Sequence, residues 1–190
     1  SDIDLSRLGS PRFVVTVDTE EEFDWSAPFT RDQHGLSHVA AIDRFQLLCD
    51  DNHVKPSYLI DYPVATDTAA IELLGGYADA KRAEIGVQLH PWVSPPFNEE
   101  VSIYNSFACN LPVELEREKL TRLHRAIVSN FGVHPDSYRA GRYGAGPATP
   151  AILQELGMAI DTSVRARFDY SDQDGPDYTK HPLTPYWLVE

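Results

Sequence analysis

Short apolar runs alternate with longer amphipathic segments along this chain. Residues 13–18 (FVVTVD) form a nearly continuous apolar run rich in β-branched side chains, which predicts a strand buried on both faces. Four further runs predict strands at residues 55–61, 84–90, 137–141 and 158–164. The hydrophobic pattern therefore predicts five strands.

The segments between these runs have the spacing of helices. The clearest is residues 112–132, with acidic side chains early, basic ones later and Gly132 at the end. Its apolar stripe consists of Leu115, Leu120, Leu123, Ile127 and Phe131. Helices are also predicted at residues 37–51, 66–82 and 149–157.

Strands that alternate with helices indicate an α/β fold, in which a parallel sheet is joined by right-handed crossovers. The pattern alone fits two architectures, an open doubly wound sheet and a closed β/α barrel. A barrel needs about seven or eight strands, so in that case roughly the last third of the domain lies outside residues 1–190.

Composition and charge exclude several classes of partner. The chain has 190 residues, enough for one domain, and a net charge of −13, which disfavours nucleic acid and anionic membrane surfaces as partners. It has no apolar run of about 18 residues that would predict a membrane span, and its N-terminal residues lack a signal-peptide pattern. We therefore expect a cytoplasmic protein, and the sequence leaves the oligomeric state open.

Polar side chains follow each predicted strand at its carboxyl end, where parallel β/α folds bind their ligands. They are Asp18 with Glu20, Glu21 and Glu22, then Asp61, then Gln88 and His90, then Arg139, Arg142 and Tyr143, and finally Asp161 and Thr162. Carboxylates and an imidazole from neighbouring strands are the ligand set of a hydrolytic divalent metal site, which zinc fits best. A spare carboxylate can serve as general base.

The acids and the histidine also have structural interpretations. An acidic run such as residues 20–22 is often a solvated loop, but its position directly after a buried strand favours one metal ligand. His90 alone is more often a structural residue. Trp92, two residues later, either stacks on a sugar ring or packs within the protein, and the sequence supports both equally.

The arginines and Asp161 have alternatives of the same kind. Arg139 and Arg142 flank a glycine, and one of them could hold the Asp18 carboxylate through a bidentate pair. The alternative is a surface ion pair without a role in catalysis. Asp161 either pairs with an arginine or only ends its strand.

From residue 13 to residue 164 the chain resembles, in order, the motifs of the polysaccharide deacetylase family (NodB homology, carbohydrate esterase family 4). TVDT places Asp18 where the family has its base, and Glu20 takes over from the metal-binding aspartate whose position Thr19 occupies. EIGVQLHPW resembles the histidine motif, with His90 between the two family positions, which are here Gln88 and Trp92.

Two later stretches complete the resemblance. YRAGRYG resembles the arginine motif, with Arg139 as the arginine and Gly141 in place of a proline. GMAIDTSV resembles the motif of an aspartate with two hydroxyl residues. The family's last motif, with a general-acid histidine, would follow residue 190.

The resemblance implies a single domain over residues 1–190, a distorted and incomplete (β/α)7 barrel that lacks its C-terminal strands. It implies a hydrolase that removes acetyl groups from an acetylated sugar with the help of a divalent metal, most simply zinc. The implied catalytic residues are Asp18, Arg139 and Asp161, the metal ligands Glu20 and His90, and the substrate-binding residues Trp92, Arg142, Tyr143 and Asn110.

Two other functions compete with this one. Gln88 and Trp92, at the family's two histidine positions, favour a catalytically inactive module that binds glycans. An open nucleotide-binding α/β protein is disfavoured, because no glycine-rich phosphate loop follows the first strand.

Overall fold

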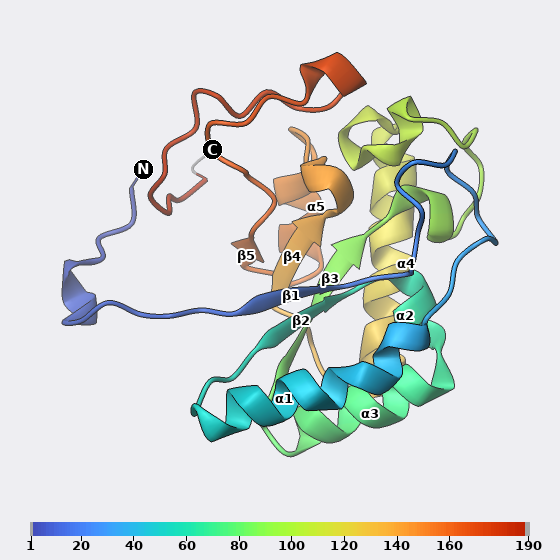
Figure 1. Ribbon diagram of the computed structural model, residues 1–190. Helices are drawn as coiled ribbons and strands as arrows, with labels where there is room; N and C mark the ends of the chain where they lie inside the picture. The colour runs from blue at the N-terminus through green and yellow to red at the C-terminus, as the bar shows by residue number, and fades with distance from the viewer. Residues whose placement is uncertain (1, 189–190) are drawn as a thin grey trace.

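A five-stranded parallel sheet forms the centre of the structure, a computed structural model in which residues 2–188 are described (Figure 1). The strands are β1 (Thr16–Thr19), β2 (Ser57–Ile60), β3 (Glu84–Leu89), β4 (Ser137–Ala140) and β5 (Ile160–Asp161). The helices are α1 (Ile42–Asp51), α2 (Tyr62–Thr66), α3 (Thr68–Asp79), α4 (Val113–Phe131) and α5 (Thr149–Glu155). Short 3-10 helices cover Ser6–Leu8, Ser37–Ala41, Pro91–Val93, Tyr104–Ser106, Ala108–Asn110, Gly141–Tyr143 and Ser171–Gln173. The predicted α/β fold is confirmed.

Each strand lies beside its neighbours in the sequence, in the order β1-β2-β3-β4-β5. A doubly wound sheet would reverse this order at a switch point, and the described part of the chain has no such reversal. β1 and β5 do not pair with each other, so the sheet is unclosed over residues 2–188. The strand order is therefore that of an arc of a β/α barrel.

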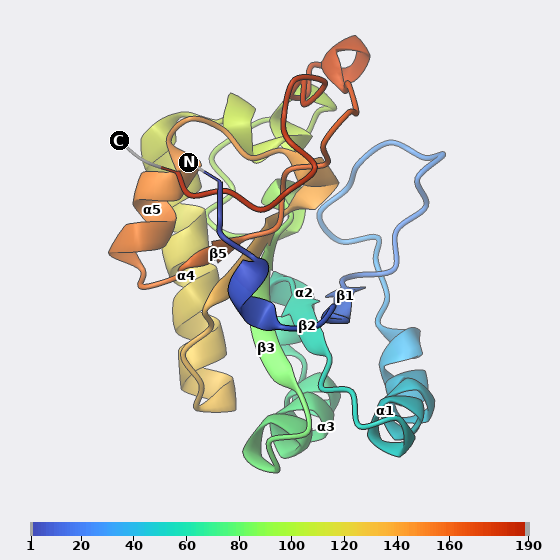
Figure 2. The same ribbon diagram turned by 90° about the vertical axis from the view of Figure 1, so that its left-hand side faces the viewer.

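One face of the sheet packs against the helices (Figures 1 and 2). The core between them includes Tyr58, Ile60, Val87, Leu89 and Tyr138 from the strands and Leu74, Leu120, Leu123, Ile127 and Ile152 from the helices. Burying a large apolar side chain stabilises a fold by roughly 1.5–3 kcal/mol. This face therefore joins the sheet to the helices.

The other face of the sheet is mostly polar. Paired residues of a parallel ladder point to the same side, and side chains alternate along each strand. The register therefore places on this face Thr16, Asp18, Ser57, Leu59, Gly86, Gln88, Ser137 and Arg139. Figure 2 looks toward this side, which the N-terminal and C-terminal segments cross. An isolated bridge joins those segments between Asp2 and Tyr186.

Two local differences from the predicted elements have simple causes. β1 begins at Thr16, and Phe13 and Val14 are exposed rather than buried, because they precede the residues that pair with β2. The sequence pattern also missed α2, a helix of five residues that is too short for a helical period. The Asp61 side chain caps α2 by accepting a hydrogen bond from the Val64 backbone N–H at 3.0 Å.

A helix that crosses a bilayer must be long and predominantly apolar. None of those described in residues 2–188 combines the length and the apolar character that crossing a bilayer requires.

Glu116 gives α4 a pH-dependent contact with α5. Its carboxylate is buried and accepts a hydrogen bond from the Thr149 hydroxyl at 2.6 Å, while burial raises its pKa above the usual 4.5. The folded state therefore holds this proton more tightly than the unfolded state, so the contribution of Glu116 to stability falls as pH rises above 4.5.

We predict that Glu116→Gln removes this pH dependence, because the amide keeps an acceptor for Thr149 but carries no charge. Thermal unfolding at about pH 5 and about pH 8 tests it. The Tm of the variant minus that of the original protein should be larger at about pH 8 than at about pH 5. A constant difference between the two proteins would contradict the assignment.

Candidate active site

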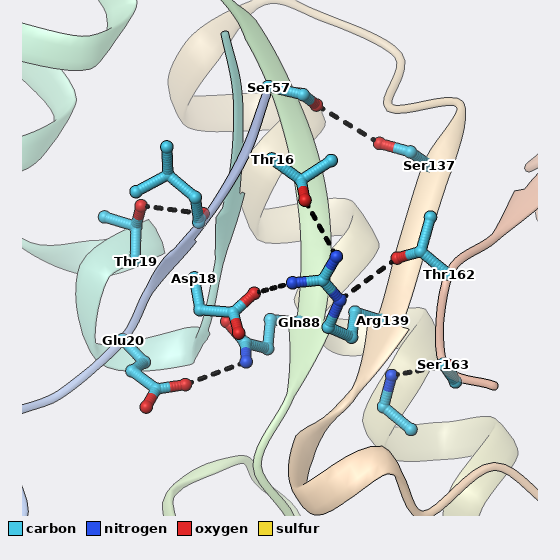
Figure 3. A network of polar contacts seen from close by, with 12 residues as sticks. Thr16, Asp18, Thr19, Glu20, Ser57, Gln88, Ser137, Arg139, Thr162 and Ser163 are labelled. Carbon is cyan, nitrogen blue, oxygen red and sulfur yellow. Dashed lines mark hydrogen bonds and ion pairs between the residues drawn. The ribbon is translucent and has the colours of Figure 1, made fainter. Parts of the chain in front are cut away.

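Polar side chains from three strands meet on the open face of the sheet, at the carboxyl ends of the strands (Figure 3). Asp18 comes from β1, Gln88 from β3 and Arg139 from β4, and the register places Gln88 directly beside Arg139. Glu20 follows β1 and joins them through a hydrogen bond from Gln88. The sequence-based expectation that strand ends would bring these groups together agrees with this arrangement.

Arg139 is the centre of the first part of the site. Its Nη1 forms an ion pair with the Asp18 carboxylate, while Nη2 donates to the Thr16 hydroxyl at 2.8 Å and Nε to the Thr162 hydroxyl at 3.2 Å. The Asp18 contact is therefore made through one nitrogen and is not the bidentate pair that the sequence suggested. Burial raises the pKa of Asp18, although the Arg139 charge opposes this shift.

His90 is the centre of the second part. The imidazole is buried, and its Nδ1 lies 2.7 Å from Oε2 of Glu21 while its Nε2 lies 3.1 Å from Oε2 of Glu20. Burial opposes protonation of His90, but the two carboxylates outweigh it and raise the imidazole pKa well above its usual value. Burial likewise opposes ionisation of Glu21, yet His90 and hydrogen bonds lower the pKa of Glu21 to about 2.

Asp61 lies behind this pair. Its side chain is fully buried and accepts a hydrogen bond from the Glu21 backbone N–H at 2.8 Å. Burial and the neighbouring Glu21 raise the pKa of Asp61 well above its usual value. One ligand atom each from Glu21, Asp61 and His90 lie within 4.8 Å of one another.

Sequence reasoning noted Glu21 and Asp61 at the strand ends but assigned neither to the site. The alternation of side chains along an extended chain was the available signal. It places Asp18 and Glu20 on one side and Glu21 on the other, and the His90 ring lies between the two glutamates.

Two observations support a divalent cation at this site. Glu21 Oε1 and Gln88 Oε1 are buried, and neither has a hydrogen-bond partner among residues 2–188. The surrounding atoms are carboxylate oxygens, an amide oxygen and an imidazole nitrogen, which are common ligands of divalent metals. Glu20 and His90, the two predicted metal ligands, are in contact.

Lys119 of α4 anchors the segment that follows His90. The buried ammonium group donates to the carbonyl oxygens of Pro91, Ser94 and Pro96 at 3.0, 2.6 and 2.7 Å. It also pairs with the Glu99 carboxylate at 2.9 Å. Four oxygen atoms around one buried ammonium group fix this segment next to the site.

Trp92 belongs to an aromatic cluster instead of an open surface. Its ring stacks on His90 with centroids 4.4 Å apart, and it also contacts Phe23, Trp25 and Phe29. Trp92 is buried, so its ring offers no free face to a sugar in this arrangement. Its position indicates that it holds the imidazole in place.

The other predicted substrate-binding residues hold loops together. Arg142 donates to the Ser106 hydroxyl and lies over the Phe107 ring at 4.0 Å. Tyr143 stacks on Tyr170 with ring centroids 5.9 Å apart. The Asn110 amide donates to the carbonyl oxygens of Tyr104 and Asp174 at 2.9 and 2.8 Å. None of these hydrogen bonds and ring contacts involves Asp18 or His90.

Asp161 lies on the opposite face of the sheet from Arg139. It pairs in register with Tyr138, and Tyr138 and Arg139 point to opposite faces because they are consecutive in β4. Asp161 accepts a hydrogen bond from the Ser163 N–H at 2.8 Å, and burial raises its pKa. Its neighbour Thr162, and not Asp161, reaches Arg139.

The fold is similar to solved structures of polysaccharide deacetylases, which confirms the resemblance seen in the sequence at the level of the fold. IcaB from Ammonifex degensii aligns with a TM-score of 0.51 and 14% identity, over 78% of this chain and 57% of its own. The chitin deacetylase from the fungal pathogen Colletotrichum lindemuthianum has the same TM-score, 0.51, and 14% identity, over 78% and 53%. A carbohydrate esterase family 4 pseudoenzyme from Bacillus anthracis has a TM-score of 0.50 and 12% identity, over 80% and 44%.

This chain spans about half the length of these solved structures. The deacetylase structures have a (β/α)7 barrel, to which the five sequential strands correspond in part. No protein-family model and no curated protein matches the chain. The comparisons therefore show a deacetylase-like fold.

Gly141 leaves room for the His90 ring. A Cβ atom at this position would overlap Cδ2 of His90 and come within 2.6 Å of the Leu89 carbonyl oxygen. The glycine that stands in place of the family's proline therefore has a steric reason: the imidazole packs directly on the backbone of β4's carboxyl end.

We predict that Gly141→Ala displaces the His90 ring and destabilises the protein by about 1–3 kcal/mol, the usual cost of overpacking. Denaturant unfolding gives the stability, and NMR of the imidazole nitrogens reports the ring position. Gly76→Ala in α3 is the matched control, since a Cβ atom there meets nothing within 4 Å. Unchanged imidazole signals in the Gly141 variant would show that the ring does not depend on this glycine.

Proposed function

We propose that this chain provides the catalytic face of a metal-dependent hydrolase that removes acetyl groups from an acetylated sugar. One observation carries the proposal. A carboxylate fixed by an arginine, Asp18 with Arg139, lies on the same open face as the Glu20–His90 pair. Asp18 and Glu20 are partly accessible, with side chains 35% and 26% exposed, while the groups that hold them are more buried.

Asp18 is the proposed general base. Arg139 holds its carboxylate in one orientation, and Thr16 and Thr162 hold the remaining guanidinium nitrogens. The raised pKa of Asp18 suits proton abstraction from a water, because a base with a higher pKa accepts a proton more readily. Asp18 would thus take the proton of the water that attacks the acetyl carbonyl.

Glu20 and His90 are the proposed ligands of a divalent ion. Such an ion, when bound, polarises the carbonyl oxygen of the acetyl group and lowers the pKa of the attacking water. Glu21 lies on Nδ1 of His90, the position from which a carboxylate orients a metal-binding imidazole. The ring would then present Nε2 toward Glu20.

We propose that residues 1–190 form one domain and that strands outside this range complete its barrel. The names of the similar structures support a carbohydrate as substrate, because they include a chitin deacetylase. The net charge of −13 supports a partner that is not nucleic acid.

We predict that Asp18→Asn lowers kcat/KM for release of acetate from acetylated chitooligosaccharides by about 10²–10⁴-fold, the usual contribution of a general base. The Tm should change by less than about 4 °C, because the amide oxygen still accepts from Arg139. Asp24→Asn is the control: it removes the same charge from an exposed carboxylate whose side-chain hydrogen bonds within residues 2–188 are to Ser26 of its own loop. Full turnover in the Asp18 variant would rule out this residue as the base.

A second candidate is a glycan-binding protein without catalysis. Gln88 stands where the family has a histidine, and one similar structure is a pseudoenzyme. Elemental analysis of the purified full-length protein separates the two candidates. The hydrolase should contain about one divalent metal ion per chain and lose its activity on treatment with a chelator. A protein that contains no metal but binds acetylated oligosaccharides would be the second candidate.

A further inference from the structure

Trp25 is an exposed aromatic side chain in the loop that follows Glu20. It is 57% exposed, whereas Trp92, the ring that the family resemblance implies for substrate binding, is buried. An indole ring has a large, flat and mostly apolar face. Trp25 therefore offers to a ligand the kind of surface that Trp92 does not.

We propose that Trp25 is a substrate-binding residue, on whose indole ring a pyranose ring of an acetylated oligosaccharide stacks. This inference rests on the carbohydrate substrate of the proposed function. It adds a contact for a sugar unit that neighbours the acetylated unit at Asp18 and His90.

The position of Trp25 beside the site is the first support. The ring centroids of Trp25 and Trp92 are 6.4 Å apart, and those of Trp92 and His90 are 4.4 Å apart. One ring thus separates Trp25 from the imidazole. An oligosaccharide with its acetyl group at Asp18 and His90 can therefore place a neighbouring sugar unit at Trp25.

The loop that contains Trp25 is closed at its base, which is the second support. The backbone N–H of Glu22 donates to the carbonyl oxygen of Gly35 at 2.8 Å, and that of Gly35 donates to the carbonyl oxygen of Glu22 at 3.4 Å. Compact surface loops whose ends lie together frequently have a function. This loop begins directly after Glu20 and Glu21, the two carboxylates that contact His90.

The packing of the Trp25 ring is the third support. Phe23 and Phe29 stack with centroids 5.0 Å apart, and the indole is nearly perpendicular to both, at 86° and 87°. It is also nearly perpendicular to Trp92, at 81°. Edge-to-face contacts of this kind are favourable, and a ring that is already held in place loses little conformational entropy when a ligand binds.

An uncharged sugar fits this surface better than an anionic ligand does. The face of an aromatic ring is electron-rich and attracts the polarised C–H groups on one side of a pyranose ring. The net charge of −13 repels anions but not an acetylated sugar. The chemistry of the surface therefore agrees with the substrate of the proposed function.

We predict that Trp25→Ala in the full-length protein raises KM for acetylated chitopentaose by about three- to tenfold, because stacking contributes mainly to binding. Its kcat should change by less than about twofold, since Asp18 and His90 keep their contacts. Initial rates of acetate release give both constants. If Trp25→Ala fails to fold, Trp25→Phe serves in its place and should raise KM by a smaller factor, because its ring is smaller.

A shorter substrate separates stacking from mere support of Trp92. N-acetylglucosamine fills only the site at Asp18 and His90, so its kcat/KM should change by less than about twofold in Trp25→Ala. Equal losses for the monosaccharide and the pentasaccharide would show that Trp25 only supports the ring behind it, and would overturn the proposal.

Tryptophan fluorescence measures the contact without turnover. In the full-length Asp18→Asn protein, added acetylated chitopentaose should shift the emission to shorter wavelength, because the sugar removes water from Trp25. The shift should be absent when Trp25→Phe is combined with Asp18→Asn. Phe13→Ala is the matched control: it removes an 82% exposed ring before the first residue of β1, at the opposite end of that strand from the site, and should change neither KM nor the shift.

A failure of this inference can be told apart from a failure of the proposed function. A protein that binds the pentasaccharide through Trp25 but releases no acetate keeps the stacking role and loses the hydrolase. A protein that releases acetate with the same KM in the original and Trp25→Ala forms, and whose emission does not shift, keeps the hydrolase and loses the role of Trp25.

Discussion

The position of the His90 imidazole between two carboxylates is the interaction on which the site depends. Glu20 contacts one ring nitrogen from the open face, and Glu21 contacts the other from the buried side. The Glu21 backbone is held by Asp61, whose side chain also caps α2. The imidazole is thus coupled to the helical layer, and a change that moves the ring disturbs both the site and the start of α2.

The helices and the apolar core lie on one face of the sheet, and this explains why polar side chains can lie on the other face. Burying charged and polar groups is costly unless they pair. The helix-covered face of the sheet contains the apolar core, so the fold is stabilised without the other face. Arg139 and Gln88 can therefore remain on that other face, where their hydrogen bonds and ion pairs offset the loss of water.

The fold and part of the site could be predicted because both follow from periodicity. The strand runs end at acids and at His90, and parallel strands bring their carboxyl ends together, so a grouping of these acids with His90 could be expected. The choice of Glu20 among the acids came from the family resemblance and not from periodicity. The role of Asp161 followed from a motif alone, and only the register shows that its side chain points to the other face. The burial of Trp92 depends on contacts with residues from a distant loop, which no local pattern records.

The choice between an active and an inactive protein depends on one position more than on the fold. A chitin deacetylase and a pseudoenzyme are both similar to this fold, so the fold alone does not distinguish the two candidate functions. Arg139 holds Asp18, the proposed base, in either case, because their ion pair does not involve Gln88. What differs is whether oxygen ligands beside a single imidazole hold a cation firmly enough. The amide nitrogen of Gln88 already donates to Glu20, so within residues 2–188 the proposed cation would depend on the Glu20 carboxylate and the His90 imidazole.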